Sequence, residues 1–184
     1  MSRRAKSRSH ETTRRSVLAE VTSSSRAGPC GAPPFERIVE LHGPALLRFC
    51  AAQVGASRAD DCFQETMLAA LRAYGEVRDA TAVRAWLFAI AARKAIDMHR
   101  AQARLPQPVE DLDALDSTVD PEYRDDALWA RVRRLPEKQR QAVTLRYVAD
   151  LSHREIAAVM QSTEAAARRN AFEGLARLKK ELAR

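Results

Sequence analysis

Apolar residues recur at every third or fourth position along most of the chain after residue 34, which is the spacing of an amphipathic helix. The sequence shows no strand-like alternation, no internal repeat and no glycine-rich phosphate loop. We therefore expect an all-α protein. The helices are predicted over roughly 35–41, 44–54, 59–74, 80–103, 122–134 and 137–149, followed by a pair between 150 and 182.

Pro44 lies at the boundary between the first two predicted helices. Proline suits the first turn of a helix, so Pro44 either begins a new helix or marks a kink.

The core stripe of the helix over 59–74 is predicted to contain Cys62, Phe63, Met67, Leu71 and Tyr74, with Gln64 and Glu65 away from it.

The last pair of helices has clear boundary signals. Ser152 and Glu155 have the spacing of a capping box, and Ser162 or Thr163 can cap the helix that follows. A short helix, a polar turn and a second helix with early basic residues are typical of a helix-turn-helix. Two packed surface helices with solvated arginines would give the same pattern. The second helix is predicted to bury a stripe of Phe172, Leu175, Leu178 and Leu182.

Charge divides the chain into segments. The net charge is +7, yet residues 105–130 carry eight acidic and one basic side chain, whereas 131–184 carry thirteen basic and six acidic ones. We expect a disordered basic tail over 1–34, a helical domain over 35–104, a flexible acidic linker over 105–121 and a second helical domain over 122–184 that contains the helix-turn-helix. Basic blocks favour a polyanionic partner such as nucleic acid.

The motifs in the sequence do not indicate a catalytic function. The four histidines are isolated, the three cysteines fit no zinc spacing, and no nucleophile motif is present. We therefore expect no catalytic residue, no metal and no cofactor. No apolar run approaches the roughly twenty residues of a membrane span and no secretory segment is evident, so a cytoplasmic protein is expected.

Three stretches form an ordered set of motifs. Residues 59–68 read ADDCFQETML, and residues 86–100 read WLFAIAARKAIDMHR. The third stretch combines LPEKQR at 135–140, VTLRY at 143–147 and LSHREIA at 151–157. The second stretch places a tryptophan before a basic helix face, an arrangement that suits an unpaired nucleic-acid strand.

In this order the stretches resemble the extracytoplasmic-function (ECF) group of bacterial RNA polymerase sigma factors. The matching family patterns are A-E-D-L-V-Q-E-T-F-L, W-L-x-x-I-A-x-N-x-x-x-D-x-x-R, and L-P-x-x-x-R with F-x-L-R-Y and L-S-Y-x-E-I-A. The resemblance runs from about 35 to 182 and implies a factor that binds core RNA polymerase, recognises promoters and helps to melt them.

The resemblance also implies site residues. Docking on the clamp helices of the largest polymerase subunit would use Asp61, Phe63, Gln64, Glu65 and Thr66. The −10 promoter element would be engaged by Trp86, Arg93, Lys94, Asp97 and Arg100. The −35 element would be read by Ser162, Thr163, Glu164, Ala167, Arg168 and Arg169. Further implied partners are the flap region of the polymerase, promoter DNA and an anti-sigma factor.

One stretch departs from the family. Its turn and recognition helix usually read G-I-S-x-G-T-V-K-S-R, whereas residues 160–169 read MQSTEAAARR, without either glycine. The register of this helix on DNA therefore stays open. A stand-alone helix-turn-helix regulator is the alternative function, and such a regulator would have no need of the Gln64–Glu65 docking face.

Overall fold

The computed structural model describes residues 31, 33–104 and 126–183, and every regular element in these ranges is helical. The all-α prediction is therefore confirmed. The predicted linker over 105–121 and almost all of the predicted tail lie outside the described residues. Within the described part of the chain, no helix combines the length and the apolar character needed to cross a membrane.

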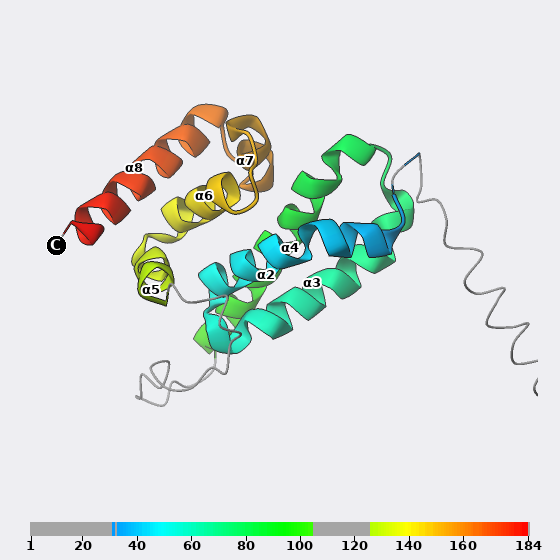
Figure 1. Ribbon diagram of the computed structural model, residues 1–184, viewed down its shortest axis with the longest axis horizontal. Coiled ribbons are helices and arrows are strands. Elements are labelled where there is room, and N and C mark those ends of the chain that lie inside the picture. Colours follow the sequence, from blue (N-terminus) through cyan, green and yellow to red (C-terminus); the bar gives the residue numbers. More distant parts are fainter. Residues whose placement is uncertain (1–30, 32, 105–125, 184) are drawn as a thin grey trace, which may run out of the picture.

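Three long helices form the first helical domain (Figure 1). They are α2 (Phe35–Val54), α3 (Ala59–Ala73) and α4 (Val83–Arg104), connected by the short 3-10 turns η2 (Ala56–Arg58), η3 (Tyr74–Glu76) and η4 (Ala80–Ala82). Each of the three packs against the other two. Phe49 of α2 meets Phe88 of α4 edge-to-face in their common core, with ring centroids 5.4 Å apart.

A single helix passes through Pro44, so no new helix begins there. Proline lacks the N–H that would bond the carbonyl of Glu40. Both residues are exposed, and water can satisfy a carbonyl on that side of the helix. The solvent-facing position of Pro44 explains why α2 tolerates it.

Four shorter helices form the second helical domain. They are α5 (Asp126–Arg134), α6 (Glu137–Tyr147), α7 (His153–Val159) and α8 (Glu164–Leu182). Helix α8 lies against both α6 and α7, and this arrangement sets the angle between the two helices of the helix-turn-helix (Figure 1).

The buried stripe of α8 differs from the predicted one. Phe172 is 73% exposed and Leu182 is 51% exposed, while Leu178 is buried as expected. The residues that face α6 and α7 are mostly small, and they are Ala167, Ala171, Gly174 and Leu178. Small side chains let α8 approach α6 closely, and this close approach turns the bulky Phe172 toward solvent. In the first helical domain, Leu71 is likewise 55% exposed rather than part of the core.

The two helical domains pack against each other. Helix α6 contacts α2, and α7 contacts α4. A continuous cluster of buried apolar residues joins Leu46 and Leu87 of the first domain to Leu145 and Ile156 of the second. The sequence predicted two domains on a flexible linker and gave no sign of this shared core.

Gly174 provides a test of the α6–α8 contact. A Cβ at this position would lie 2.6 Å from Cγ2 of Val143 and 3.2 Å from the carbonyl oxygen of Gln139. Overpacking costs about 1–3 kcal/mol, which outweighs the roughly 1 kcal/mol that alanine gains in a helix. Gly174→Ala should therefore lower the free energy of unfolding in urea by up to about 2 kcal/mol.

The matched control is Gly75→Ala, because a Cβ at Gly75 meets nothing within 4 Å. This control should leave the urea midpoint nearly unchanged. Val143 is a core residue, so the contact is isolated by a double-mutant cycle: Gly174→Ala should cost less in a Val143→Ala background than in the parent, because the smaller side chain makes room for the added methyl group. Equal midpoints for the two glycine variants would show that the contact is not tight.

Candidate nucleic-acid interface

One face of α4 carries most of the residues predicted to engage the −10 element. Positions seven apart lie nearly in line along a helix, so Trp86, Arg93 and Arg100 share one face, and Asp97 joins them at four residues from Arg93. Arg93, Asp97 and Arg100 are exposed. Trp86 is half-buried and packs beside Tyr74, with ring centroids 6.2 Å apart. The tryptophan is thus held by the core on one side and remains partly accessible on the other.

Lys94 connects two predicted sites. Its Nζ lies 3.0 Å from Oε2 of Glu65 on α3, and both side chains remain partly exposed. Glu65 belongs to the predicted polymerase-docking set and Lys94 to the predicted −10 set. The two surfaces therefore share an edge at this ion pair.

The predicted docking residues on α3 divide into outward and inward positions. Asp61, Gln64 and Glu65 are exposed, and Phe63 is half-buried against the core. Thr66 is completely buried, and its hydroxyl donates a hydrogen bond to the carbonyl oxygen of Cys62 at 2.7 Å. Thr66 is therefore not on the accessible face, and any effect it has on docking must act through the position of α3.

Leu68 extends the docking face, although the family motif did not point to it as a site residue. It is 53% exposed and lies three residues beyond Glu65 and four beyond Gln64, on the same side of α3. Leu71, three residues further on, is exposed as well, so the two leucines together give this surface an apolar contact for a partner. Its helical spacing from Gln64 and Glu65 was the signal that could have identified it.

The helix-turn-helix begins with a complete capping box. The Ser152 hydroxyl accepts a hydrogen bond from the backbone N–H of Glu155, and Glu155 Oε2 accepts bonds from the Ser152 N–H at 2.7 Å and from its hydroxyl at 2.6 Å. These bonds lower the pKa of the Glu155 carboxyl, with the side-chain bond from Ser152 as the largest cause. The predicted capping box is confirmed.

The turn between α7 and α8 has a left-handed residue. Gln161 has a φ of 49°, a conformation that favours glycine. Two residues later, the Thr163 side chain caps α8 by accepting a hydrogen bond from the N–H of Ala166. Gln161 is thus the position in this turn at which a glycine would relieve the backbone.

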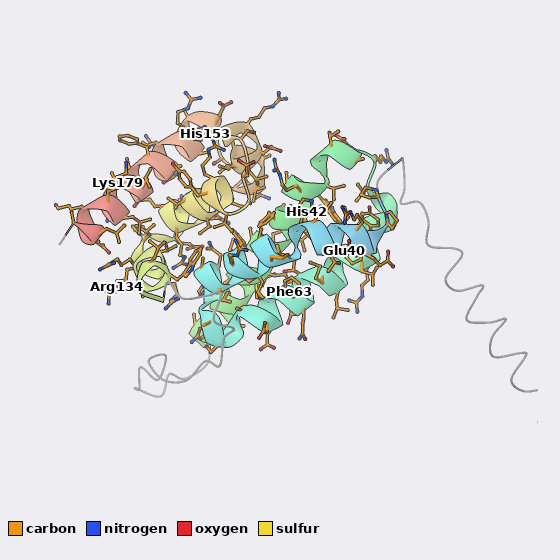
Figure 2. All side chains as sticks on the ribbon, viewed as in Figure 1. Glu40, His42, Phe63, Arg134, His153 and Lys179 are labelled. Carbon is orange, nitrogen blue, oxygen red and sulfur yellow. The ribbon has the colours of Figure 1, made fainter. Side chains whose placement is uncertain are left out.

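The start of α8 presents most of the predicted −35 residues. Ser162, Thr163, Glu164, Arg168 and Arg169 are exposed, and His153 marks this end of the molecule in Figure 2. Ala167 is completely buried, so its side chain does not reach the surface.

Two exposed arginines, Arg168 on α8 and Arg154 on α7, lie in the helix-turn-helix. Arg168 lies 3.0 Å from Oε1 of Glu164, one turn earlier. Arg154 on α7 is also exposed. The first helix of such a motif crosses the DNA backbone, which makes Arg154 a further candidate that the sequence alone did not single out.

A cleft separates the α4 face from the second helical domain. Its volume is about 220 Å³. The first domain contributes Ala92, Arg93, Ile96, Asp97 and Arg100 to its walls, and the second contributes Gln141, Val159, Met160 and Gln161. The −10 face and the turn of the helix-turn-helix therefore lie opposite each other.

Two of the cysteines are core residues, as the apolar stripe over 59–74 predicted for Cys62. Cys50 and Cys62 are both free and completely buried, on the facing helices α2 and α3. In the part of the chain that the structure describes, no group of three or more histidine, cysteine or carboxylate side chains is placed to hold a metal ion.

The chain matches two family models and a number of known proteins. The family description "Sigma-70 region 2" matches residues 38–105, and "Sigma-70, region 4" matches residues 125–178. The chain is 33% identical over 180 residues to the ECF RNA polymerase sigma factor SigD of Mycobacterium tuberculosis, covering 90% of this chain and 82% of SigD.

Two solved structures share the fold. The sigma factor RpoE, in complex with the anti-sigma factor NepR from Bartonella quintana, has a TM-score of 0.66 at 20% identity and covers 81% of this chain and 96% of its own. CnrH, in complex with the cytosolic domain of CnrY, has a TM-score of 0.60 at 24% identity and covers 81% of this chain and 87% of its own.

The two matched regions and their arrangement define an RNA polymerase sigma factor. Within this class, the similarity to SigD across nearly the whole chain shows that the protein belongs to the ECF group. The resemblance seen in the sequence is confirmed at the level of the family.

The capping box predicts a pH-dependent contribution to stability. A carboxyl whose pKa is lowered by folding stabilises the native state above its unfolded pKa, and this stabilisation is lost as the pH falls through the folded pKa. Ser152→Ala should lower the free energy of unfolding by about 1 kcal/mol near neutral pH. The difference from the parent should shrink in urea titrations below about pH 4.

Ser57→Ala is the matched control, because Ser57 is exposed and makes no capping hydrogen bond in its short 3-10 turn. This variant should show neither the loss at neutral pH nor the pH dependence. A Ser152→Ala deficit that stays constant down to acid pH would contradict the role assigned to the Glu155 carboxylate.

Proposed function

We propose that this protein is an alternative sigma factor that directs core RNA polymerase to promoters through three surfaces. The exposed face of α3 docks on the clamp helices of the largest polymerase subunit, the α4 face engages and helps to melt the −10 element, and α8 reads the −35 element. The observation that carries the proposal is the alignment of Trp86, Arg93, Asp97 and Arg100 on one face of α4, next to the Glu65 docking surface.

The α4 face has the chemistry that an opened strand requires. Arginines at 93 and 100 can neutralise phosphates, and the accessible side of Trp86 offers a stacking surface to an unpaired base. Stacking is worth about 1–3 kcal/mol per base, comparable to the few kcal/mol needed to unstack one. A polymerase-bound α4 can therefore stabilise melted DNA without catalytic groups of its own.

Helix α8 supports recognition of duplex DNA. Its N-terminal residues are the ones that enter the major groove in a helix-turn-helix. Arg169 is exposed there, and Arg168 is paired with Glu164, which orients its guanidinium along the helix surface. Phosphate contacts set the position on DNA, and base-edge contacts from the same helix give specificity.

The remaining assignments follow from this function. The chain acts as a non-catalytic initiation factor in the cytoplasm, where core polymerase and promoter DNA are found. The flap region of the polymerase is the second docking partner, and an anti-sigma factor is the regulator. The exposed Leu68 beside Gln64 and Glu65 favours this function over a stand-alone regulator, which has no use for a docking face on α3.

Glu65→Lys tests the docking surface. The substitution reverses a charge on the exposed face of α3 and places a second lysine beside Lys94, where the parent has an ion pair at 3.0 Å. Co-purification of the full chain with core polymerase should fall at least tenfold, because the substitution reverses a charge in the proposed contact surface and breaks the ion pair with Lys94. The measurement is the amount of sigma factor retained on immobilised core polymerase.

Glu76→Lys is the control, since Glu76 is an exposed glutamate in η3, beyond the C-terminal end of α3 and about three turns from Glu65. It should be retained like the parent. Normal retention of Glu65→Lys, in a protein with unchanged circular dichroism, would exclude α3 as the docking surface.

The double variant Arg168→Ala with Arg169→Ala tests the upstream contact. A promoter is first found by transcription from a DNA library with purified core polymerase, followed by start-site sequencing. Binding of the holoenzyme to that promoter should then weaken, because fewer phosphates are neutralised. The slope of log K against log salt should fall by about one for each phosphate that the removed arginines had neutralised.

Arg177→Ala controls for general charge, because Arg177 is exposed on the same helix but two turns further from its N-terminus. A slope that stays at the parent value in the double variant would show that neither Arg168 nor Arg169 contacts phosphate.

A further inference from the structure

Three aromatic rings form a chain at the corner where α3 ends and α4 begins. Tyr74 follows the last residue of α3, and 6% of its surface is exposed. Its ring meets the ring of Phe35 on α2 edge-to-face, with centroids 5.3 Å apart. It also meets the indole of Trp86 on α4, with centroids 6.2 Å apart and the ring planes tilted by 47°. These three side chains are the aromatic corner.

A hydrogen bond fixes the central ring of the aromatic corner. The Tyr74 hydroxyl donates to the carbonyl oxygen of Pro33, next to the N-cap residue of α2. Burial raises the pKa of the Tyr74 phenol, and the Glu36 carboxylate raises it further, so the hydroxyl keeps the proton that it donates. Both the ring and the hydroxyl of Tyr74 are therefore held by the start of α2.

Trp86 is the outermost member of the aromatic corner. It lies near the start of α4, is half-buried and packs against the core of the first domain. Because Tyr74 is buried, its contact lies on the core side of the indole and leaves the other side accessible. The accessible side belongs to the same face of α4 as Arg93 and Arg100.

An aromatic side chain stacks well on a base only if its ring is already held in place. Ordering a mobile side chain on binding costs free energy, and a ring that is ordered in advance avoids this cost. The contact with Tyr74 limits the rotation of Trp86, because a tilted ring at 6.2 Å occupies part of the space that the indole would otherwise sweep. The support comes from a residue that is itself anchored to another helix.

We infer that Tyr74 is a positioning residue for Trp86, and that its ring holds the indole in the orientation that stacks on an unpaired base of the −10 strand. The inference rests on the proposed function of Trp86 in melted DNA. Tyr74 is buried, so it acts through Trp86 and not by touching DNA. It also lies outside the stretches 59–68 and 86–100, which carry the family resemblance in this domain.

Tyr74→Leu tests the inference, because leucine keeps the site apolar and removes the ring. All variants carry Trp129→Phe, so that Trp86 is the remaining one of the two tryptophans. In the free chain, the fast component of the decay of tryptophan fluorescence anisotropy should grow, because the indole gains local rotation. In the holoenzyme, open complexes detected by permanganate at a promoter found by library transcription should fall about fivefold. Retention on core polymerase should not change.

Tyr74→Phe is the conservative variant. It keeps the ring contacts with Phe35 and Trp86 and loses the hydroxyl, so open complexes and the anisotropy decay should return close to the parent values. Phe49→Leu is the matched control, because it removes a buried ring of the same domain whose partner is Phe88. It should reproduce a general loss of stability without the change at Trp86.

A double-mutant cycle separates positioning from a purely structural role. Trp86→Ala alone should reduce open complexes, and adding Tyr74→Leu should reduce them no further, because the positioned indole is gone. An equal loss from Tyr74→Leu with and without Trp86, an equal loss from Phe49→Leu, or an unchanged anisotropy decay would overturn the inference. If Tyr74→Leu does not fold by circular dichroism, Tyr74→Met takes its place in the same measurements.

The readouts distinguish this inference from the proposed function. Failure of the parent to bind polymerase and open a promoter would overturn the proposed function, while the anisotropy decay would still decide whether Tyr74 holds the indole. A parent that opens promoters, together with a Tyr74→Leu variant that opens them equally well, would overturn the inference alone. Faster rotation of Trp86 with fewer open complexes, both restored by Tyr74→Phe, would support the two together.

Discussion

Small side chains set the distances between the helices of this protein. Alanines and a glycine occupy the contact positions of α8, and Ala52 occupies a comparable position at the domain boundary. Close approach of backbones therefore shapes the packing of α8 and of the domain boundary, whereas the core of the first domain also contains the packed rings of Phe49 and Phe88. The exposure of Phe172 and the tight fit of Gly174 against Val143 both follow from this constraint.

A contact surface of small apolar residues does little to specify how two helices are placed relative to each other. Surfaces lined by alanine are nearly flat, so several relative placements of two helices bury similar areas. Directional polar groups remove this ambiguity, because an unpaired buried donor costs about 1–3 kcal/mol. The pairing of Gln53 with Thr144 and Arg140 satisfies its groups in the observed placement of α2 on α6. The contact between α2 and α6 can then be both specific and reversible, because a few hydrogen bonds are easily exchanged for hydrogen bonds to water.

The sequence predicted local features well. The helices, the capping box at Ser152 and the cap at Thr163 depend on residues close in sequence, and periodicity or side-chain chemistry reveals them. The family resemblance then supplied candidate surfaces that periodicity alone could not name. Thr66 and Ala167 show the limit of that transfer, because a motif gives a residue's position but not the side of the helix that is buried.

The failed predictions concern packing between distant parts of the chain. The expected burial of Leu71 and Phe172 assumed that bulky apolar residues face inward, but both are exposed. On α8, the close packing of the small residues decides which face is covered. The packing of the two domains against each other was also not predicted from the sequence. Gln53 and Thr144 are 91 positions apart, and an isolated glutamine at the end of a helix has the pattern of a solvated residue.

The left-handed turn at Gln161 affects whether the C-terminal half of this protein can be exchanged for that of another sigma factor. A glycine there would relieve backbone strain but would also remove a side chain from the wall of the interdomain cleft, opposite Arg93 and Asp97. The turn that orients the reader of one promoter element thus borders the reader of the other. A hybrid factor that borrows its C-terminal half from a relative would inherit a mismatched boundary unless the residues at 53, 144 and 161 are exchanged as a set. In this protein, the two halves are not interchangeable modules.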